Sequence, residues 1–245
     1  YLKDLTPTTI HDINAMVALY RPGPIESIPE YVKRKHNPRS ISFFDPRMKD
    51  ILDQSYGLLV YQDDVLLTAI KLAGYSWLEA DKLRKAMGKK IPKEMAEQKS
   101  KFTEGCIKNG LTENKAQELW KLIEPFAAYG FNKAHAASYG RVAYQTAYAK
   151  ANFPHEYMTA ILSAESGDIE KIAEMINECN RMGIKVLPPE INESFKDFTL
   201  NSGVIRFGLE TIKNVGTNVV EAINAESQKN GAFKTVADLL SRVDS

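Results

Sequence analysis

Apolar residues recur three or four positions apart through most of the chain, which is the period of an amphipathic helix. Near the start, Ile10, Ile13 and Val17 share this spacing and follow Thr6 and Pro7. Threonine is a good N-cap and proline suits the first helical position, so the pattern predicts a helix that begins after Thr6.

Several further helices follow from the same period. One is predicted after Thr112, where Leu119, Trp120 and Ile123 form an apolar stripe suited to packing rather than to base stacking. Residues 57–61 predict a short strand or the lead into a helix that continues to residue 73, and residues 156–182 predict one or two more helices. The chain is therefore predicted to be mainly α.

The pattern changes near Gly183, where short apolar runs replace the helical period. Residues 195–200 and 204–209 are separated by Asn201-Ser202-Gly203, which predicts a β-hairpin with a three-residue turn. We therefore expect a mainly α chain with a small β-hairpin or sheet, an α+β fold.

Residues 209–226 predict two helices around a tight turn, the arrangement of a helix-hairpin-helix element. The turn lies at Asn214-Val215-Gly216, directly after Lys213, and its backbone amides are candidates for contacts with DNA phosphates. Asn214 stands where such hairpins prefer glycine. A simple packing hairpin is the alternative.

A group of cations surrounds a short helix that is predicted within residues 76–90. Ser76 and Glu79 have the spacing of a capping box, Ala80, Leu83 and Met87 share one apolar face, and Gly88 is predicted to end the helix. The basic residues of this segment are Lys82, Arg84, Lys85, Lys89 and Lys90. Two interpretations stay open: favourable charge at a helix C-terminus, and a site for a polyanion such as phosphate.

The segment 126–154 predicts a helix that begins after Gly130 and Asn132 and ends before Pro154. Lys133 and His135 lie in its first turn, where free backbone amides already attract anions. Asn132, His135 and Tyr139 lie on one stripe of the helix, so they are candidates for contacts with a phosphate, a sugar or a base. A partly buried histidine with satisfied hydrogen bonds is the alternative.

The segment 31–39 is predicted to be a basic loop, and Lys33, Arg34 and Lys35 are its candidates for contact with a DNA backbone. A solvated run of charges is the alternative. Before it, the sequence Arg21-Pro22-Gly23-Pro24 predicts a rigid turn.

The composition is that of a globular protein: 245 residues are 44% hydrophobic and 26% charged, with a net charge of +1. No apolar run approaches the roughly 18 residues that a membrane span needs. Cys106 and Cys179 lie far apart, without the spacing of a zinc site or a small disulfide-bonded domain. The chain does not begin with methionine and shows no signal peptide, so we expect a soluble, cytoplasmic piece of a longer protein.

Several motifs together carry a resemblance to one protein family. They are ALYRPGP (residues 18–24), YGLLVYQDDV (56–65), ADKLRKAMGKK (80–90), YGFNKAHAASY (129–139) and PPEIN (188–192). In this order and spacing they resemble the fingers region of the family C polymerases, the bacterial replicative DNA polymerase III alpha subunits. The sequence departs from the family pattern at Lys85, Ala134 and the pair Asp63-Asp64, and Lys85 loses the two-pronged phosphate contact of an arginine.

The resemblance implies a fingers module that binds the incoming deoxynucleoside triphosphate (dNTP) and primer-template DNA. Residues 1–25 would lead in from the palm, 26–207 would form the fingers and 208–245 a truncated helix-hairpin-helix region. The residues implied to face the nucleotide are Arg84, Lys85, Lys89, Lys90, Asn132, Lys133 and His135, and Tyr139 joins them as a candidate from its place on the same stripe of the helix. Those proposed for DNA are Lys33, Arg34, Lys35, Lys213, Asn214, Val215 and Gly216.

The resemblance also implies that the catalytic aspartates, and the Mg²⁺ that they hold, belong to a palm domain outside this chain. Asp63 and Asp64 are adjacent and are predicted to start a helix or a solvated turn rather than to share a metal. We therefore expect no catalytic or metal-binding residue here, and no polymerase activity from this chain alone. The implied partners are the palm and thumb of the full-length protein to which this chain belongs, the sliding clamp and other replicase subunits.

Two other classes of function compete with this interpretation. The chain is alternatively a helical nucleic-acid-binding module that does not handle nucleotides, with the basic loop and the hairpin as its surfaces. A hydrolase that uses Cys106 or His135 is disfavoured, because no base and orienting carboxylate are suitably spaced around either residue.

Overall fold

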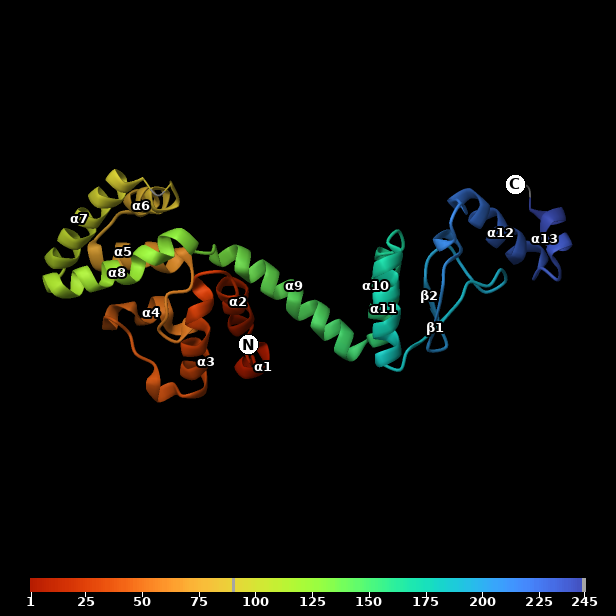
Figure 1. Cartoon of the computed structure of the whole chain (residues 1–245), viewed down its shortest axis with the longest axis horizontal. Coiled ribbons are helices and arrows are strands. Elements are labelled where there is room, and N and C mark those ends of the chain that lie inside the picture. Colours follow the sequence, from red (N-terminus) through yellow and green to blue (C-terminus); the bar gives the residue numbers. More distant parts are fainter. Residues whose placement is uncertain (90, 244–245) are drawn as a thin grey trace. The chain divides into compact units, whose positions relative to one another are not determined.

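Helices dominate the fold and one small sheet accompanies them, which confirms the predicted fold class (Figure 1). The computed structural model describes residues 1–89 and 91–243. The chain divides into two compact units, residues 1–144 and residues 145–245, and the division falls inside helix α9. None of the helices in the described part of the chain is both long and apolar enough to cross a membrane.

In the described residues of the first unit, the regular secondary structure is helical apart from an isolated bridge. Its elements are α1 (Leu2–Leu5), α2 (Ile10–Leu19), η1 (Pro24–Ser27), α3 (Ile28–His36), η2 (Pro38–Ser40), η3 (Pro46–Met48), α4 (Lys49–Leu52), η4 (Asp53–Ser55), α5 (Gln62–Ala73), α6 (Trp77–Lys89), α7 (Pro92–Lys108), α8 (Glu113–Tyr129) and the beginning of α9 (Lys133–Asn152).

The main core of this unit lies among α5, α6, α7 and α8. Trp120 and Phe102 are fully buried there, with their ring centroids 5.5 Å apart. Gly105 of α7 lies so close to Ala73 of α5 that any side chain at 105 would overlap the Ala73 carbonyl oxygen. Close packing of these helices therefore requires glycine at this position.

A second core joins α1, α2 and α3 to the residues before α5 and to the start of α9. Leu5, Leu19, Ile28 and Tyr31 are fully buried in it, and Ala136 of α9 packs against the same cluster. This core therefore anchors the first turns of α9.

The predicted start of the first helix is wrong by several residues. Helix α2 begins at Ile10 and is capped by Thr9, whose amide donates to Asp12 Oδ2 at 3.1 Å while its hydroxyl accepts from the Asp12 amide. Thr6 instead ends α1 in the left-handed conformation, with φ 43°. The reciprocal capping box of Thr9 and Asp12 decides the boundary.

The basic segment at residues 31–39 is not the predicted loop, because α3 continues to His36. Burial of Ile28 and Tyr31 on one side of this helix stabilises it. The turn at Arg21-Pro22-Gly23-Pro24 is confirmed, since Gly23 has φ 98° and η1 follows directly.

The second unit contains α10 (Pro154–Ala164), α11 (Ile169–Arg181), β1 (Lys185–Leu187), β2 (Thr199–Asn201), β3 (Val204–Arg206), η5 (Leu209–Thr211), α12 (Thr217–Asn230) and α13 (Val236–Arg242). The prediction of one or two helices over residues 156–182 is confirmed, since α10 and α11 cover this segment.

The sheet has the order β1-β3-β2, with β1 parallel and β2 antiparallel to β3. Asn201 pairs directly with Val204, so the loop contains only Ser202 and Gly203, both with positive φ. The predicted three-residue turn is therefore wrong. A two-residue loop of this conformation matches the twist of the paired strands.

The predicted pair of helices at 209–226 is only partly correct. Its first half is the short η5, and its second half is α12, which extends to Asn230. Asn214 lies between them with φ 69°, the left-handed conformation that favours glycine.

Candidate functional site

The start of α9 brings together the predicted cap and the predicted histidine. Asn132 Oδ1 accepts a 2.8 Å hydrogen bond from the amide of His135, which confirms Asn132 as the N-cap. The amide of Lys133 donates to Asp63 Oδ2 at 2.9 Å, so a carboxylate from the start of α5 holds the first amide of α9. Two of the amides of the first turn are therefore satisfied by side chains.

A row of aromatic rings runs from Phe131, just before α9, into the helix. The His135 ring lies 5.2 Å from the Phe131 ring and 4.7 Å from the Tyr139 ring, the latter edge to face. The guanidinium of Arg21 lies 5.0 Å above Phe131. His135 is exposed and Tyr139 is 59% exposed, so the alternative of a buried histidine is wrong.

Lys133 turns toward the protein and lies over an aromatic ring. Its Nζ is 5.5 Å from the centroid of Tyr61, which is itself buried. This cation–π contact holds the ammonium at the junction of α5 and α9 while the side chain stays partly exposed.

Asp64 lies beneath this junction and is almost completely buried. Its Oδ2 accepts hydrogen bonds from the amides of Val60 and Tyr61, each at 2.9 Å. Burial nevertheless raises the pKa of Asp64 to about 6. The prediction that Asp63 and Asp64 start a helix is confirmed by α5, whereas the solvated alternative is wrong for Asp64.

The two carboxylates of this junction are not arranged to bind a metal ion. Asp63 is directed at the amide of Lys133, and Asp64 at the amides before α5, so the two carboxylates do not share an open position. Among residues 1–89 and 91–243, no group of three or more histidine, cysteine, aspartate or glutamate side chains is placed to hold a metal.

Two cations of α6, Arg84 and Lys85, share Asp81 as an acidic partner. Arg84 Nη2 lies 2.7 Å from Asp81 Oδ1 and Lys85 Nζ lies 2.7 Å from Asp81 Oδ2. Hydrogen bonds from Lys85 and Arg84 hold the pKa of the Asp81 carboxyl below its usual range. These pairs are exposed, so the two cations stay available to a stronger anion at little cost.

The ends of α6 only partly match the prediction. The capping box is confirmed, because the Ser76 amide donates to Glu79 Oε2 at 2.8 Å and the Glu79 amide donates to Ser76 Oγ at 3.3 Å. Gly88 does not end the helix, which continues to Lys89. An exposed glycine costs a helix only about 1 kcal/mol, less than burial of the neighbouring Met87 contributes. Lys90 lies outside the described residues.

The predicted DNA contacts of α3 differ sharply in exposure. Lys33 is exposed and pairs with Glu30 at 3.3 Å. Arg34 instead donates to the carbonyl oxygens of Ser42 and Tyr56, both at 3.1 Å. The Lys35 side chain is only 7% exposed and its Nζ donates to Thr6 O at 3.0 Å.

The turn before α12 leaves its polar groups on the surface. Lys213, Asn214 and Gly216 are exposed, and the amide of Val215 donates to Ile212 O at 3.0 Å. This turn belongs to the second unit, whereas the candidate nucleotide residues belong to the first.

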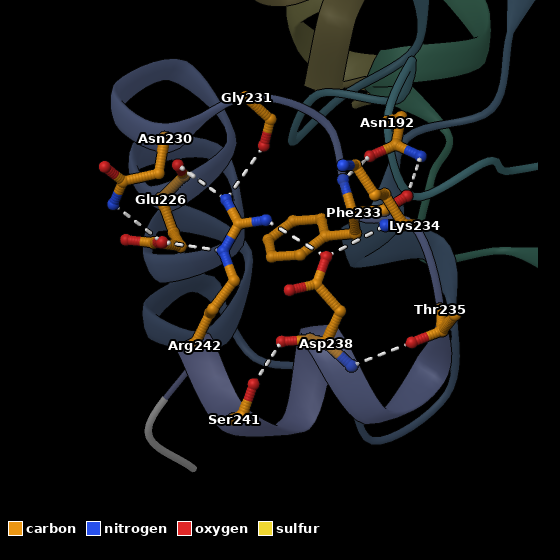
Figure 2. A network of polar contacts seen from close by, with 10 residues as sticks. All are labelled: Asn192, Glu226, Asn230, Gly231, Phe233, Lys234, Thr235, Asp238, Ser241 and Arg242. Carbon is orange, nitrogen blue, oxygen red and sulfur yellow. Dashed lines mark hydrogen bonds and ion pairs between the residues drawn. The ribbon is translucent and has the colours of Figure 1, made fainter.

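A polar network fixes the elements after this turn (Figure 2). Arg242 of α13 donates to Glu226 Oε1 and to Gly231 O, each at 2.8 Å, and its guanidinium lies 4.4 Å from the Phe233 ring. Asn192 holds the same segment by accepting from the Phe233 amide at 2.7 Å and donating to its carbonyl oxygen at 3.1 Å. Arg242 thus joins α13 to the end of α12, and Asn192, which lies between β1 and β2, binds the segment between these two helices.

Both cysteines are buried and free. Burial raises the pKa of the Cys106 thiol to about 11 and also raises the pKa of Cys179. A buried, protonated thiol is a poor nucleophile, which argues further against a hydrolase built on Cys106.

The sequence signals one of the two carboxylate contacts of the candidate site and not the other. Asp81 has the i, i+3 and i+4 spacing to Arg84 and Lys85 that signals pairing along a helix. Asp63 gives no such signal, because its partner Lys133 lies 70 positions away.

Comparison with known families identifies two regions of the chain. Residues 1–110 match the family model of the bacterial DNA polymerase III alpha subunit finger domain, and residues 183–245 match a helix-hairpin-helix motif. The chain belongs to the bacterial DNA polymerase III alpha subunit family. The resemblance carried by the five sequence motifs is thereby confirmed.

Individual relatives align with nearly the whole chain. It is similar to the DNA polymerase III subunit alpha of Chlamydia trachomatis (44% identical over 242 residues), of Thermus aquaticus (44% over 247 residues) and of Escherichia coli K12 (43% over 251 residues), in each case over 99% of this chain. The alignments cover 20%, 20% and 22% of these relatives, so the chain spans about a fifth of their length.

The finger-domain match includes α6 with Arg84, Lys85 and Lys89, and it ends before α9. The Asn132 and His135 cluster lies between the two matched regions but within the segment aligned with the alpha subunits. The family therefore covers both groups of candidate residues.

Proposed function

We propose that this chain is the fingers module of a replicative DNA-directed DNA polymerase and that it binds the triphosphate of the incoming dNTP. The observation that carries the proposal is the start of α9, where Asn132 caps the helix beside Lys133 and an exposed His135 ring lies edge to face with Tyr139. A phosphate would meet positive charge there, and a base or sugar would meet an aromatic face.

The chemistry of nucleotide transfer explains why such a module carries cations and no catalytic group. Phosphoryl transfer needs the protein mainly to position the triphosphate and to neutralise the charge that develops on the leaving pyrophosphate. Lys133 would help to neutralise this charge from α9, with the exposed His135 ring beside it, and Arg84, Lys85, Lys89 and Lys90 would do so from α6 and the residue after it. Asp81 would release Arg84 and Lys85 to the stronger anion.

The remaining half of the reaction belongs to other parts of the full-length protein. A palm domain would provide the carboxylates that bind Mg²⁺. Asp63 and Asp64 do not serve this purpose, because both carboxylates accept hydrogen bonds from backbone amides. We therefore expect this chain alone to be inactive. Residues 1–25 would lead in from the palm, 26–207 would form the fingers and 208–245 the helix-hairpin-helix region.

Primer-template DNA is the second proposed partner. The helix-hairpin-helix match favours the turn at Lys213, Asn214, Val215 and Gly216 as a phosphate contact, since Lys213, Asn214 and Gly216 are exposed there and bring a lysine beside the backbone of a turn. On α3 we favour Lys33, because Arg34 and Lys35 already bind carbonyl oxygens. The palm and thumb, the sliding clamp and other replicase subunits are proposed partners of the full-length protein in the cytoplasm.

The same helix-hairpin-helix match supports the alternative of a plain nucleic-acid-binding module. The two functions predict different phenotypes for one pair of variants in the full-length protein. Under the alternative, Lys213→Ala weakens DNA binding while Lys133→Ala leaves KM for dNTP unchanged.

Steady-state kinetics of the full-length polymerase test the proposal. We expect Lys133→Ala and His135→Ala each to raise KM for dNTP by about tenfold or more, which is the loss of roughly 1.4 kcal/mol of binding. Lys99→Ala, which removes an exposed lysine of α7, is the matched control and should leave KM unchanged. An unaltered KM in both α9 variants would refute nucleotide binding at this site.

A further inference from the structure

The junction of α5 and α9 joins segments that are far apart in the sequence. Asp63 Oδ2 accepts from the Lys133 amide at 2.9 Å, and the neighbouring Gln62 amide donates to Phe131 O at 3.0 Å. Tyr61 and Phe131 form an isolated parallel bridge beside them. Three successive residues at the start of α5 thus hold the residues around the Asn132 cap.

Helix α5 is a firm support for these contacts. Val65, Ala69 and Leu72 are buried in the main core, where Leu83 and Met87 of α6 belong to the same cluster. Asp64 adds hydrogen bonds to the amides just before α5. The same helix therefore contacts both elements that carry the candidate nucleotide-binding cations.

We propose that Asp63 is a positioning residue of the nucleotide site, an inference that rests on the proposed function. Its carboxylate fixes the first amide of α9, while Asn132 fixes the amide of His135. Together these bonds set the orientation of the first turn, from which Lys133 and His135 project. Removing the Asp63 bond leaves a helix N-terminal amide without its side-chain acceptor and allows the turn to move.

Direct contact of Asp63 with the substrate is disfavoured by charge. A carboxylate beside a triphosphate repels it, whereas a carboxylate directed at a backbone amide is compensated locally. Asp63 therefore acts through α9, and an uncharged acceptor of the same shape can replace it. This property distinguishes a positioning role from a role of the charge itself.

The test compares four variants of the full-length polymerase, with KM for dNTP and kcat measured on one primer-template. We expect Asp63→Ala to raise KM about tenfold with kcat changed less than threefold. Asp63→Asn keeps an oxygen that can accept from the Lys133 amide, so it should stay within threefold of the wild type. Asp50→Asn, which removes an exposed carboxylate paired with Lys71, is the matched control and should match the wild type.

Lys133→Ala is the fourth variant and separates the two proposals. If Lys133→Ala raises KM and Asp63→Ala does not, positioning by Asp63 is refuted while nucleotide binding stands. If Lys133→Ala leaves KM for dNTP unchanged, and His135→Ala does so as well, the proposed function itself fails. If Asp63→Asn is as damaging as Asp63→Ala, the charge matters rather than the hydrogen bond, and the inference is overturned.

A folding defect is excluded by comparing Tm values of the four variants. Should Asp63→Ala fail to fold, Asp63→Ser replaces it, because serine suits the first turn of α5 but is too short to reach the Lys133 amide. The serine variant is then expected to raise KM about tenfold, and an unchanged KM refutes the inference.

Discussion

Tyr56 Oη donates a 2.7 Å hydrogen bond to Asp12 Oδ1, across 44 positions of the sequence. Asp12 is fully buried, and Tyr31 reaches the same oxygen at the longer distance of 3.4 Å. The other oxygen of Asp12 lies 3.7 Å from Lys35 Nζ. This buried carboxylate thus ties α2 to α3 and to the segment before α5.

The two tyrosines predict unequal losses of stability. A hydrogen bond to a charged group contributes about 1.5 to 3 kcal/mol, so we expect Tyr56→Phe to lower the free energy of unfolding by that amount. Tyr31→Phe is the matched control and should cost less than about 1 kcal/mol, because its bond is long. Urea unfolding followed by tryptophan fluorescence measures both, since Trp77 and Trp120 lie in the first unit. Equal losses would contradict this account of Asp12.

Because of Asp64, we predict that the free energy of unfolding falls as the pH rises. Its folded pKa of about 6 lies above the ordinary value of 3.8, because burial disfavours the carboxylate. The folded chain therefore binds the proton more tightly than the unfolded chain does. Stability from this group is complete below pH 3.8 and is lost as the pH rises through 6.

Asp64→Asn removes that titration. Between pH 4 and pH 7 we expect the unfolding free energy of the variant to gain roughly 1 to 3 kcal/mol relative to the wild type. Measuring this difference at each pH cancels the contributions of other acids. A difference that is constant over the range would show that Asp64 titrates normally.

Two helical glycines should respond in opposite directions to substitution by alanine. Gly140 of α9 is buried, and a side chain there would overlap Asn14 Oδ1 of α2, whereas Gly88 of α6 has open space around it. We expect Gly140→Ala to destabilise the first unit by about 1 to 3 kcal/mol through overpacking. Gly88→Ala should instead stabilise it by up to about 1 kcal/mol. Urea unfolding decides the question, and a stabilising Gly140→Ala would contradict the packing of α9 on α2.

Replacing Arg242 is expected to loosen the structure locally in the second unit. Arg242→Ala removes the bonds to Glu226 and to Gly231 O and the contact with Phe233. We expect amide hydrogen exchange of residues 231–243 to become about tenfold faster or more. Lys229→Ala, near the end of α12, is the control and should leave exchange unchanged. Unaltered exchange in Arg242→Ala would mean that α13 is held by its apolar contacts alone.

Local signals made much of the fold predictable. The capping pairs of Ser76 with Glu79 and of Asn132 with His135 act within one turn, so the starts of α6 and α9 could be located from sequence. The apolar stripe of α8 was visible for the same reason. The chain therefore reveals most of its helices without any knowledge of tertiary contacts.

The sequence could not reveal which polar groups bind partners far along the chain. Lys35 lies 29 positions from Thr6, and Arg34 lies 22 positions from Tyr56, yet these contacts turn two apparent DNA ligands toward the protein. The contact between Asp63 and Lys133 is hidden in the same way. Residue type and spacing identify candidate chemistry, whereas only tertiary packing decides which cations face solvent.

Photo-crosslinking tests most directly whether the start of α9 holds the nucleotide. The full-length polymerase would be irradiated on primer-template DNA with a dNTP that carries a photoreactive group on its γ-phosphate, and the adducts would be mapped by mass spectrometry. We predict adducts within residues 129–139, which an excess of natural dNTP abolishes and Lys133→Ala reduces several-fold. Adducts confined to other parts of the protein, with none in this segment, would contradict the account.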